Sequence, residues 1–161
     1  MAIHKVNIDE FYDQDYKLIA IHSALEDYRI VYFINKLFNV RLEISSEDIE
    51  IKTGISEAHF SHYIYSDLEN DVKWNLIPNK TFFSSTTKEN SPLFNETDTT
   101  FCSSIYLLPE QKTTDYLLKI EEADDSFDIS FIIEKLNSLK FITTAYELGQ
   151  NKIKSKNNLI F

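Results

Sequence analysis

Glycine and cysteine are nearly missing from this sequence, and each shortage excludes a kind of site. Only 2 of the 161 residues are glycine, whereas a Gly-rich phosphate loop or a dinucleotide-binding turn needs several close backbone approaches that only glycine permits. The single cysteine, Cys102, can form neither an internal disulfide nor, alone, a thiolate metal site. The patterns G-x-S-x-G and H-E-x-x-H are also absent. The enzyme classes that such motifs reveal are therefore excluded.

Basic residues and long apolar runs are also scarce. The chain has 16 Lys and Arg against 26 Asp and Glu, a net charge of −10. This charge argues against nucleic-acid binding over the whole surface, which needs a basic footprint. No apolar run approaches the roughly 20 residues that span a bilayer, and the first residues lack the apolar core of a signal peptide. We therefore expect a soluble, cytoplasmic protein that does not contact a membrane.

The remaining composition predicts one folded domain followed by a tail. Hydrophobic residues make up 43% of the chain and aromatic residues 14%, which is a globular mixture of a length that fits one domain. We expect a single α+β domain over residues 1–150. Within it, residues 84–100 are rich in Ser, Thr and Asn and predict a polar connector loop. Residues 151–161 form a tail that is basic and then apolar.

Hydrophobic patterning predicts the elements of that domain. The apolar run over residues 16–22 predicts a central strand. Ser23 and Glu26 match a capping box, which predicts a helix from about residue 24 to 38. Further expected elements are strands at 60–65, 72–77, 104–108, 114–120 and 141–148 and a helix at 127–139. This order predicts a mainly antiparallel sheet with two helices on one face, in a ferredoxin-like or ACT-like arrangement with an inserted hairpin.

Aromatic residues on the first expected helix form a stripe beside its main apolar stripe. Leu25, Tyr28 and Tyr32 follow the helical spacing. Aromatic stripes of this kind usually belong to the core, so burial is favoured over the alternative of a partner-binding surface. Because the helix is so widely apolar and the chain so acidic, we also predict a homodimer.

Two groups of residues resemble metal ligands without matching a known site. His59 and His62 have ligand-like spacing, but on a strand they point to opposite faces, and zinc needs three or four converging ligands. Five carboxylates within residues 121–128 suggest a Ca²⁺ or Mg²⁺ loop. Their spacing does not fit an EF-hand, so a solvated loop that caps the following helix is favoured. We predict no metal and no cofactor.

Residues 108–116 gather reactive side chains beside a proline. Glu110, Asp115 and Tyr116 are types that serve as general acids and bases. Pro109, however, sets the backbone for a chain reversal, and strand alternation then places Asp115 and Tyr116 on opposite faces. A structural turn is therefore favoured over an active site, with the role of Glu110 left open.

The tail offers a second set of candidate interaction residues. Lys154 and Lys156 precede an apolar end at Phe161. Such a segment can dock on the sheet edge of a partner, or it can fold back on its own acidic domain. The sequence leaves both alternatives open.

Residues 108–116 read Leu-Pro-Glu-Gln-Lys-Thr-Thr-Asp-Tyr and resemble the signature of the IPExxxVDY family of small bacterial proteins. Leu108 replaces the Ile of that signature and Thr114 replaces the Val. Further likenesses are Asp27-Tyr28, Asn35, Lys154-Ser155-Lys156 and Asn158-Leu159-Ile160-Phe161. The resemblance implies a bacterial cytoplasmic protein and assigns no catalytic residues.

These observations favour a non-enzymatic binding or regulatory module that acts through protein contacts. The turn at Pro109–Tyr116 and the tail would be its interaction surfaces. The alternative is a small hydrolytic enzyme that uses Glu110, Asp115 or a histidine. A third hypothesis is RNA binding through the basic tail.

Overall fold

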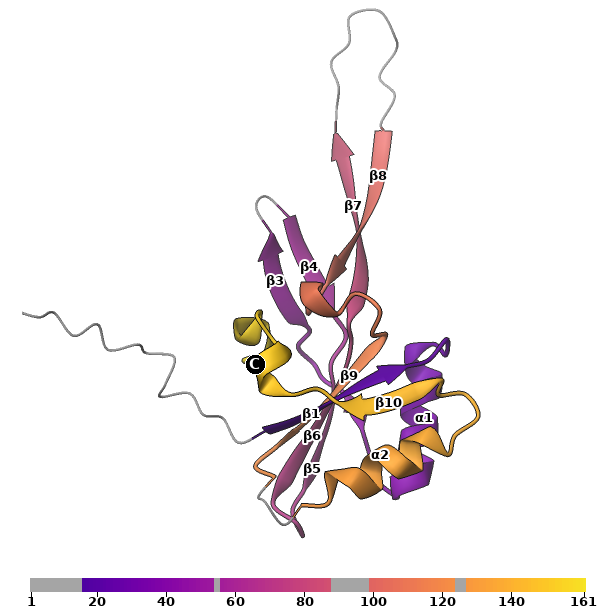
Figure 1. Cartoon of the computed structure of the whole chain (residues 1–161). Helices are drawn as coiled ribbons and strands as arrows, with labels where there is room; N and C mark the ends of the chain where they lie inside the picture. Colours follow the sequence, from indigo (N-terminus) through magenta and orange to yellow (C-terminus); the bar gives the residue numbers. More distant parts are fainter. Residues whose placement is uncertain (1–15, 54–55, 88–98, 124–126) are drawn as a thin grey trace, which may run out of the picture.

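The computed structural model describes residues 16–53, 56–87, 99–123 and 127–161. These residues form an α+β structure with a mainly antiparallel sheet and two helices (Figure 1). The α+β class, the mainly antiparallel sheet and the two helices predicted from the sequence are therefore confirmed. None of the described helices combines the length and apolar character needed to cross a bilayer.

The main sheet has six strands in the order β10-β1-β9-β6-β5-β2, and every neighbouring pair is antiparallel. In that order the strands span Thr144–Glu147, Tyr16–His22, Tyr116–Glu121, Val72–Pro78, Tyr63–Asp67 and Glu43–Ile44. The first predicted strand has the predicted bounds. The predicted hairpin of residues 60–65 and 72–77 is confirmed as β5 and β6. Its first strand begins at Tyr63 and not at Phe60, because residues 61–62 are not part of a strand.

Both faces of the sheet carry a core, because successive side chains of a strand alternate between faces. Ile19 and Ile21 of β1 pack toward the helices, whereas Leu18 and Ala20 pack toward the opposite side. The first core takes in Ile30, Ile34, Ile132 and Leu136 from the two helices. The second core takes in Phe60, Leu107, Ile153 and Leu159. Both helices thus cover one face, as predicted.

The helices are α1, Asp27–Phe38, and α2, Ile129–Asn137. The predicted capping box is wrong: α1 begins later, and no side-chain cap forms at its start. Ser23 instead accepts the N–H of Leu25 at 3.2 Å and donates to the carbonyl of Phe141 at 2.9 Å. Asp128 caps α2 by accepting the N–H of Phe131 at 3.0 Å, as expected for a carboxylate in the acidic loop.

The outer stripe of α1 is exposed, and the prediction that it is buried is wrong for its tyrosines. Tyr28 is 67% exposed and Tyr32 59% exposed. The buried contacts of the helix are made by Ile30, Val31 and Ile34, and this single stripe suffices to cover the sheet. The two tyrosines therefore point away from the core.

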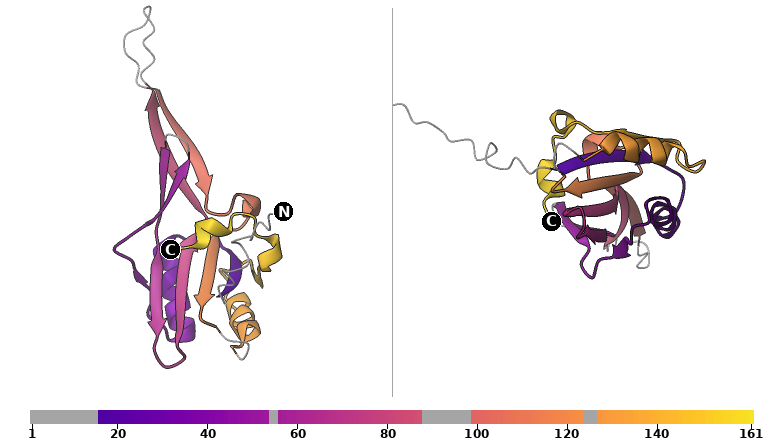
Figure 2. Two further views of the ribbon diagram at one scale, coloured as in Figure 1. Left: turned by 90° about the vertical axis from the view of Figure 1, so that its left-hand side faces the viewer. Right: turned by 90° about the horizontal axis from the view of Figure 1, so that it is seen from below.

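Two hairpins lie outside the main sheet. β3 and β4 span Ile49–Thr53 and Ser56–Phe60, and β7 and β8 span Lys80–Thr87 and Thr99–Tyr106. The β7–β8 hairpin projects beyond the sheet (Figure 2). It corrects the predicted connector loop: residues 84–87 and 99–100 belong to paired strands, while 88–98 lie outside the described residues. The Ser- and Thr-rich composition is typical of a loop, although threonine also favours strands.

Candidate functional site

A buried amide holds the turn of residues 108–116 in place. Pro109–Gln111 forms a 3-10 turn, and Asn79, which has no exposed surface, lies beneath it. The Asn79 side chain donates to the carbonyls of Gln111 at 2.7 Å and Thr114 at 3.0 Å. Its oxygen accepts the N–H of Leu108 at 2.9 Å. Three backbone groups of the turn are thus fixed by one side chain.

Asp115 and Tyr116 point in different directions, as the strand alternation predicted. Asp115 is exposed and accepts the backbone N–H of Ser23 at 2.9 Å. The Tyr116 hydroxyl is 2.6 Å from the carbonyl of Leu25 and 3.0 Å from a carboxylate oxygen of Asp27. Burial, followed by the nearby Asp27 carboxylate, raises the pKa of Tyr116. The hydroxyl therefore stays protonated and holds the start of α1.

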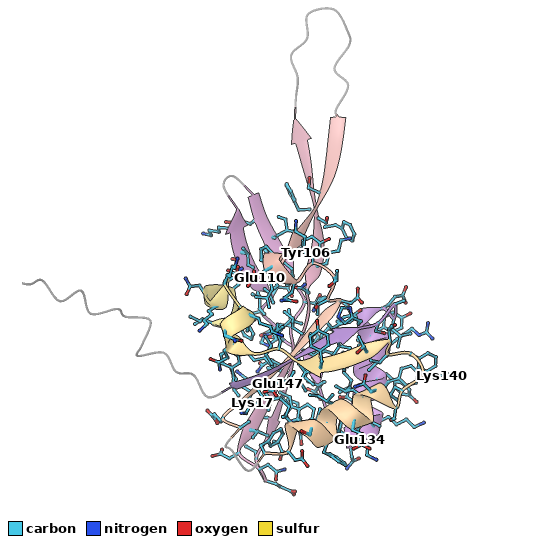
Figure 3. All side chains as sticks on the ribbon, viewed as in Figure 1. Lys17, Tyr106, Glu110, Glu134, Lys140 and Glu147 are labelled. Atoms are coloured by element: carbon cyan, nitrogen blue, oxygen red, sulfur yellow. The ribbon has the colours of Figure 1, made fainter. Side chains whose placement is uncertain are left out.

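Glu110 lies beside the tail (Figure 3). Its side-chain hydrogen bonds go to the tail and not to Asp115 or Tyr116. One carboxylate oxygen accepts the N–H groups of Lys154 at 2.6 Å and Ser155 at 2.9 Å. The other accepts the Ser155 hydroxyl at 3.0 Å. Burial acts to raise the pKa of Glu110, but the hydrogen bonds from Ser155, from its own backbone N–H and from Lys154 outweigh it and the pKa is lowered. Glu110 is thus an ionised carboxylate that binds backbone N–H groups. The side chains of Glu110, Asp115 and Tyr116 therefore do not converge on one site.

Lys119 is a buried cation on the sheet face that the tail covers. It has no exposed surface, and its ammonium donates to Glu121 and, at 2.7 Å, to the carbonyl of Leu159. The ammonium also lies 4.5 Å from the ring centre of Phe161 and 5.2 Å from that of Tyr16, which is a favourable cation–π distance.

The charge of Lys119 is balanced by a carboxylate at its side. Burial lowers the pKa of Lys119, and the bond to Glu121 opposes this shift. Burial acts to raise the pKa of Glu121, but Lys119 outweighs it and the pKa of Glu121 is lowered. Lys73 lies 3.6 Å from the same carboxylate. Lys119 and Glu121 therefore form an ion pair, and Lys73 is a second cation beside it.

His62 and Asn75 complete this polar cluster. The His62 ring nitrogen and the Asn75 side-chain oxygen are 2.9 Å apart, and Asn75 donates to the carbonyl of Lys119 at 3.5 Å. Phe161 packs edge-on against the His62 ring, with centroids 4.8 Å apart. Burial lowers the pKa of His62, outweighing the bond to Asn75. His62 is therefore neutral near pH 7.

The two ligand-like histidines lie apart, but the predicted reason is wrong: β4 ends at Phe60, so His62 is not on the same strand as His59. His62 is buried, whereas His59 is exposed on β4 with its ring nitrogen 3.7 Å from Glu50. Within the described ranges, no three side chains of His, Cys, Asp or Glu gather as a metal site requires.

The segment of residues 149–161 packs over Glu110, Lys119 and His62. It contains two 3-10 turns, Gln150–Lys152 and Lys156–Leu159. Ile153 and Leu159 are buried in the second core, and burial of such side chains contributes roughly 1.5–3 kcal/mol each. The Asn158 side chain donates to the carbonyl of Leu107 at 2.7 Å. Of the two alternatives for the tail, this structure shows it folded back on its own domain.

We call this binding surface the tail groove and define it by Leu107, Glu110, Lys119, His62 and Tyr16. Its chemistry is that of peptide recognition. Glu110 accepts backbone N–H groups in the middle of the segment, and Lys119 donates to a backbone carbonyl near its C-terminal end. Lys154 and Lys156 stay exposed, and Phe161 is 36% exposed.

Sequence reasoning missed Lys119, Asn75 and Asn79 as residues of the site. Lys119 interrupts the apolar run Leu117-Leu118-Lys119-Ile120. A lysine at a strand position beside buried neighbours is rarely buried without a partner, so this interruption was a usable signal. No comparable signal in the sequence distinguishes Asn75 or Asn79 from a surface asparagine. No protein-family model and no curated protein matches the chain.

Proposed function

We propose that this protein is a non-enzymatic binding module that acts through protein contacts. The observation that carries the proposal is the outward position of Tyr28 and Tyr32, one turn apart on α1 and 67% and 59% exposed. Tyrosine is enriched at the centres of protein interfaces and supplies large contact area. Two such side chains on a surface helix supply an anchor for a partner.

The aromatic surface continues beyond the helix. Tyr32 packs edge-on against Phe33, with centroids 5.4 Å apart. Phe33 in turn packs against Phe141, at 4.7 Å, in the segment between α2 and β10. We propose a second copy of the chain as the partner, with both copies burying the same face about a two-fold axis.

The state of the signature carboxylate supports a binding role over hydrolysis. A general acid needs a pKa raised toward the working pH, but the pKa of Glu110 is lowered by the backbone groups that it holds. Asp115 and Tyr116 bind separate parts of the backbone. Each of the three therefore stabilises a local arrangement of the chain.

We also propose a ferredoxin-like core with insertions. The strands β10-β1-β9-β6 lie in the order expected when two β-α-β units interleave, one containing α1 and the other α2. The strands β2 to β5 and the β7–β8 hairpin would then be insertions. Membership of the IPExxxVDY family, a bacterial source and a cytoplasmic location are further proposals, supported by residues 108–116 and by the composition.

The test compares self-association of three full-length proteins by sedimentation velocity. We expect the wild type to be a dimer and the Tyr28→Ser/Tyr32→Ser variant to be a monomer. Leu68→Ser is the matched control, because Leu68 is 90% exposed in the turn between β5 and β6; it should leave the dimer intact. A wild type that stays monomeric up to its solubility limit, or a double variant that dimerises equally well, would contradict the proposal.

A further inference from the structure

The segment of residues 149–161 is held by side chains of the domain and not by a strand ladder. The N–H groups of Lys152, Ile153, Asn158 and Ile160 bond carbonyls within the segment itself. The segment can therefore leave the groove with these bonds intact. The main sheet would keep its full set of paired strands, because the segment contributes 3-10 turns and not a strand.

The tail groove recognises both backbone and side chains of its occupant. Glu110 binds two successive N–H groups and the Ser155 hydroxyl. The two buried anchors, Ile153 and Leu159, are six positions apart. Between them the Asn158 amide bonds the domain backbone. An occupant must therefore present this pattern of side chains at this spacing.

An empty tail groove is chemically unfavourable. Departure of the segment removes the Leu159 carbonyl and the Phe161 ring from Lys119. It also uncovers the apolar sites of Ile153 and Leu159. Because the apolar side chains that line these sites would then face water, an open groove favours binding of another segment with the same pattern.

We propose that the tail groove is a peptide-recognition site and that a second copy of this chain supplies residues 149–161 to it by exchange. This inference goes beyond the contact proposed for α1, because the groove lies on the opposite face of the sheet. The charge of the segment fits the domain of either copy, because residues 151–161 carry three lysines and no acid, whereas residues 1–150 carry a net charge of −13.

Competition from the chain's own segment controls the exchange. A tethered segment has an effective concentration in the millimolar range, so the groove is filled from its own chain in dilute solution. Exchange with a second copy becomes favourable when one chain has a defective segment and another has a defective groove.

The first experiment mixes two such full-length chains. Glu110→Ala impairs the groove, and Leu159→Asp impairs the segment, because Leu159 is buried. Each is placed in the Tyr28→Ser/Tyr32→Ser background, so that association through α1 does not contribute. Light scattering should show a 1:1 complex in the mixture and monomers in each separate sample. Monomers in the mixture would overturn the exchange, provided circular dichroism shows both chains folded.

The second experiment uses a fluorescent synthetic peptide of residues 149–161 and does not depend on the folding of the Glu110→Ala protein. The peptide should bind the Leu159→Asp protein at least tenfold more tightly than the wild type, whose groove is occupied. A peptide that itself carries Leu159→Asp is the control and should bind neither protein. Equal binding of both peptides, or no binding to the Leu159→Asp protein, would overturn the recognition site.

Discussion

Replacement of Lys119 by methionine is the most informative test of how the domain holds its tail. Methionine matches the length of lysine but has no charge, so Lys119→Met leaves Glu121 without its buried partner. Loss of one member of a buried ion pair typically costs about 3–5 kcal/mol. The Glu121 side chain is 22% exposed and keeps Lys73 at 3.6 Å, so the cost of removing Lys119 should lie at the lower end of that range. We expect a loss of about 3 kcal/mol in the free energy of unfolding, including the bond to Leu159.

The double variant Lys119→Met/Glu121→Leu separates the ion pair from packing. It removes both charges, and replacing a buried pair by apolar side chains is often neutral. We expect it to recover about 2 kcal/mol of the loss, with about 1 kcal/mol remaining for the lost bond to the Leu159 carbonyl.

Urea unfolding followed by tryptophan fluorescence measures both variants. Trp74 is the only tryptophan of the chain and is buried, so its emission reports loss of the core. The slope of the transition should not change, which would show that the denatured state is unaffected. A loss below about 1 kcal/mol for Lys119→Met, or no recovery in the double variant, would refute the role given to the buried pair.

Three further predictions concern single side chains. Asn79→Leu removes three hydrogen bonds and leaves the Leu108 N–H buried without a partner, so urea unfolding should show a loss of about 3 kcal/mol. Tyr116→Phe removes only the hydroxyl and should cost about 1–2 kcal/mol in the same assay. Because burial lowers the pKa of His62 from 6.5 in the folded state, the unfolded chain binds the proton more strongly, and stability should fall as the pH drops from about 6.5 toward 5. In His62→Asn this part of the pH dependence should be reduced; an unchanged dependence would contradict the assignment.

Local patterns predicted the centre of the sheet well. The bounds of β1 follow from an unbroken apolar run, and the split between Asp115 and Tyr116 follows from the two-residue period of a strand. These features depend on neighbouring residues alone, so one sequence is enough to predict them.

Features that depend on distant partners were predicted poorly. Ser23 fits a helix cap locally, but the carbonyl of Phe141 and the carboxylate of Asp115 bind its polar groups. The bond from Lys119 to the carbonyl of Leu159 joins residues 40 positions apart in the chain. Sequence patterning does not reveal such long-range hydrogen bonds, and the tail groove is built almost entirely from them.

The central claim is that Glu110 holds the tail in its groove through the N–H groups of Lys154 and Ser155. Amide hydrogen exchange, resolved by residue, tests this most directly. In Glu110→Ala both amides should exchange at least tenfold faster than in the wild type, because their acceptor is gone. Asp115→Ala is the matched control and should accelerate the Ser23 amide alone. Unchanged exchange of Lys154 and Ser155 in Glu110→Ala would contradict the claim.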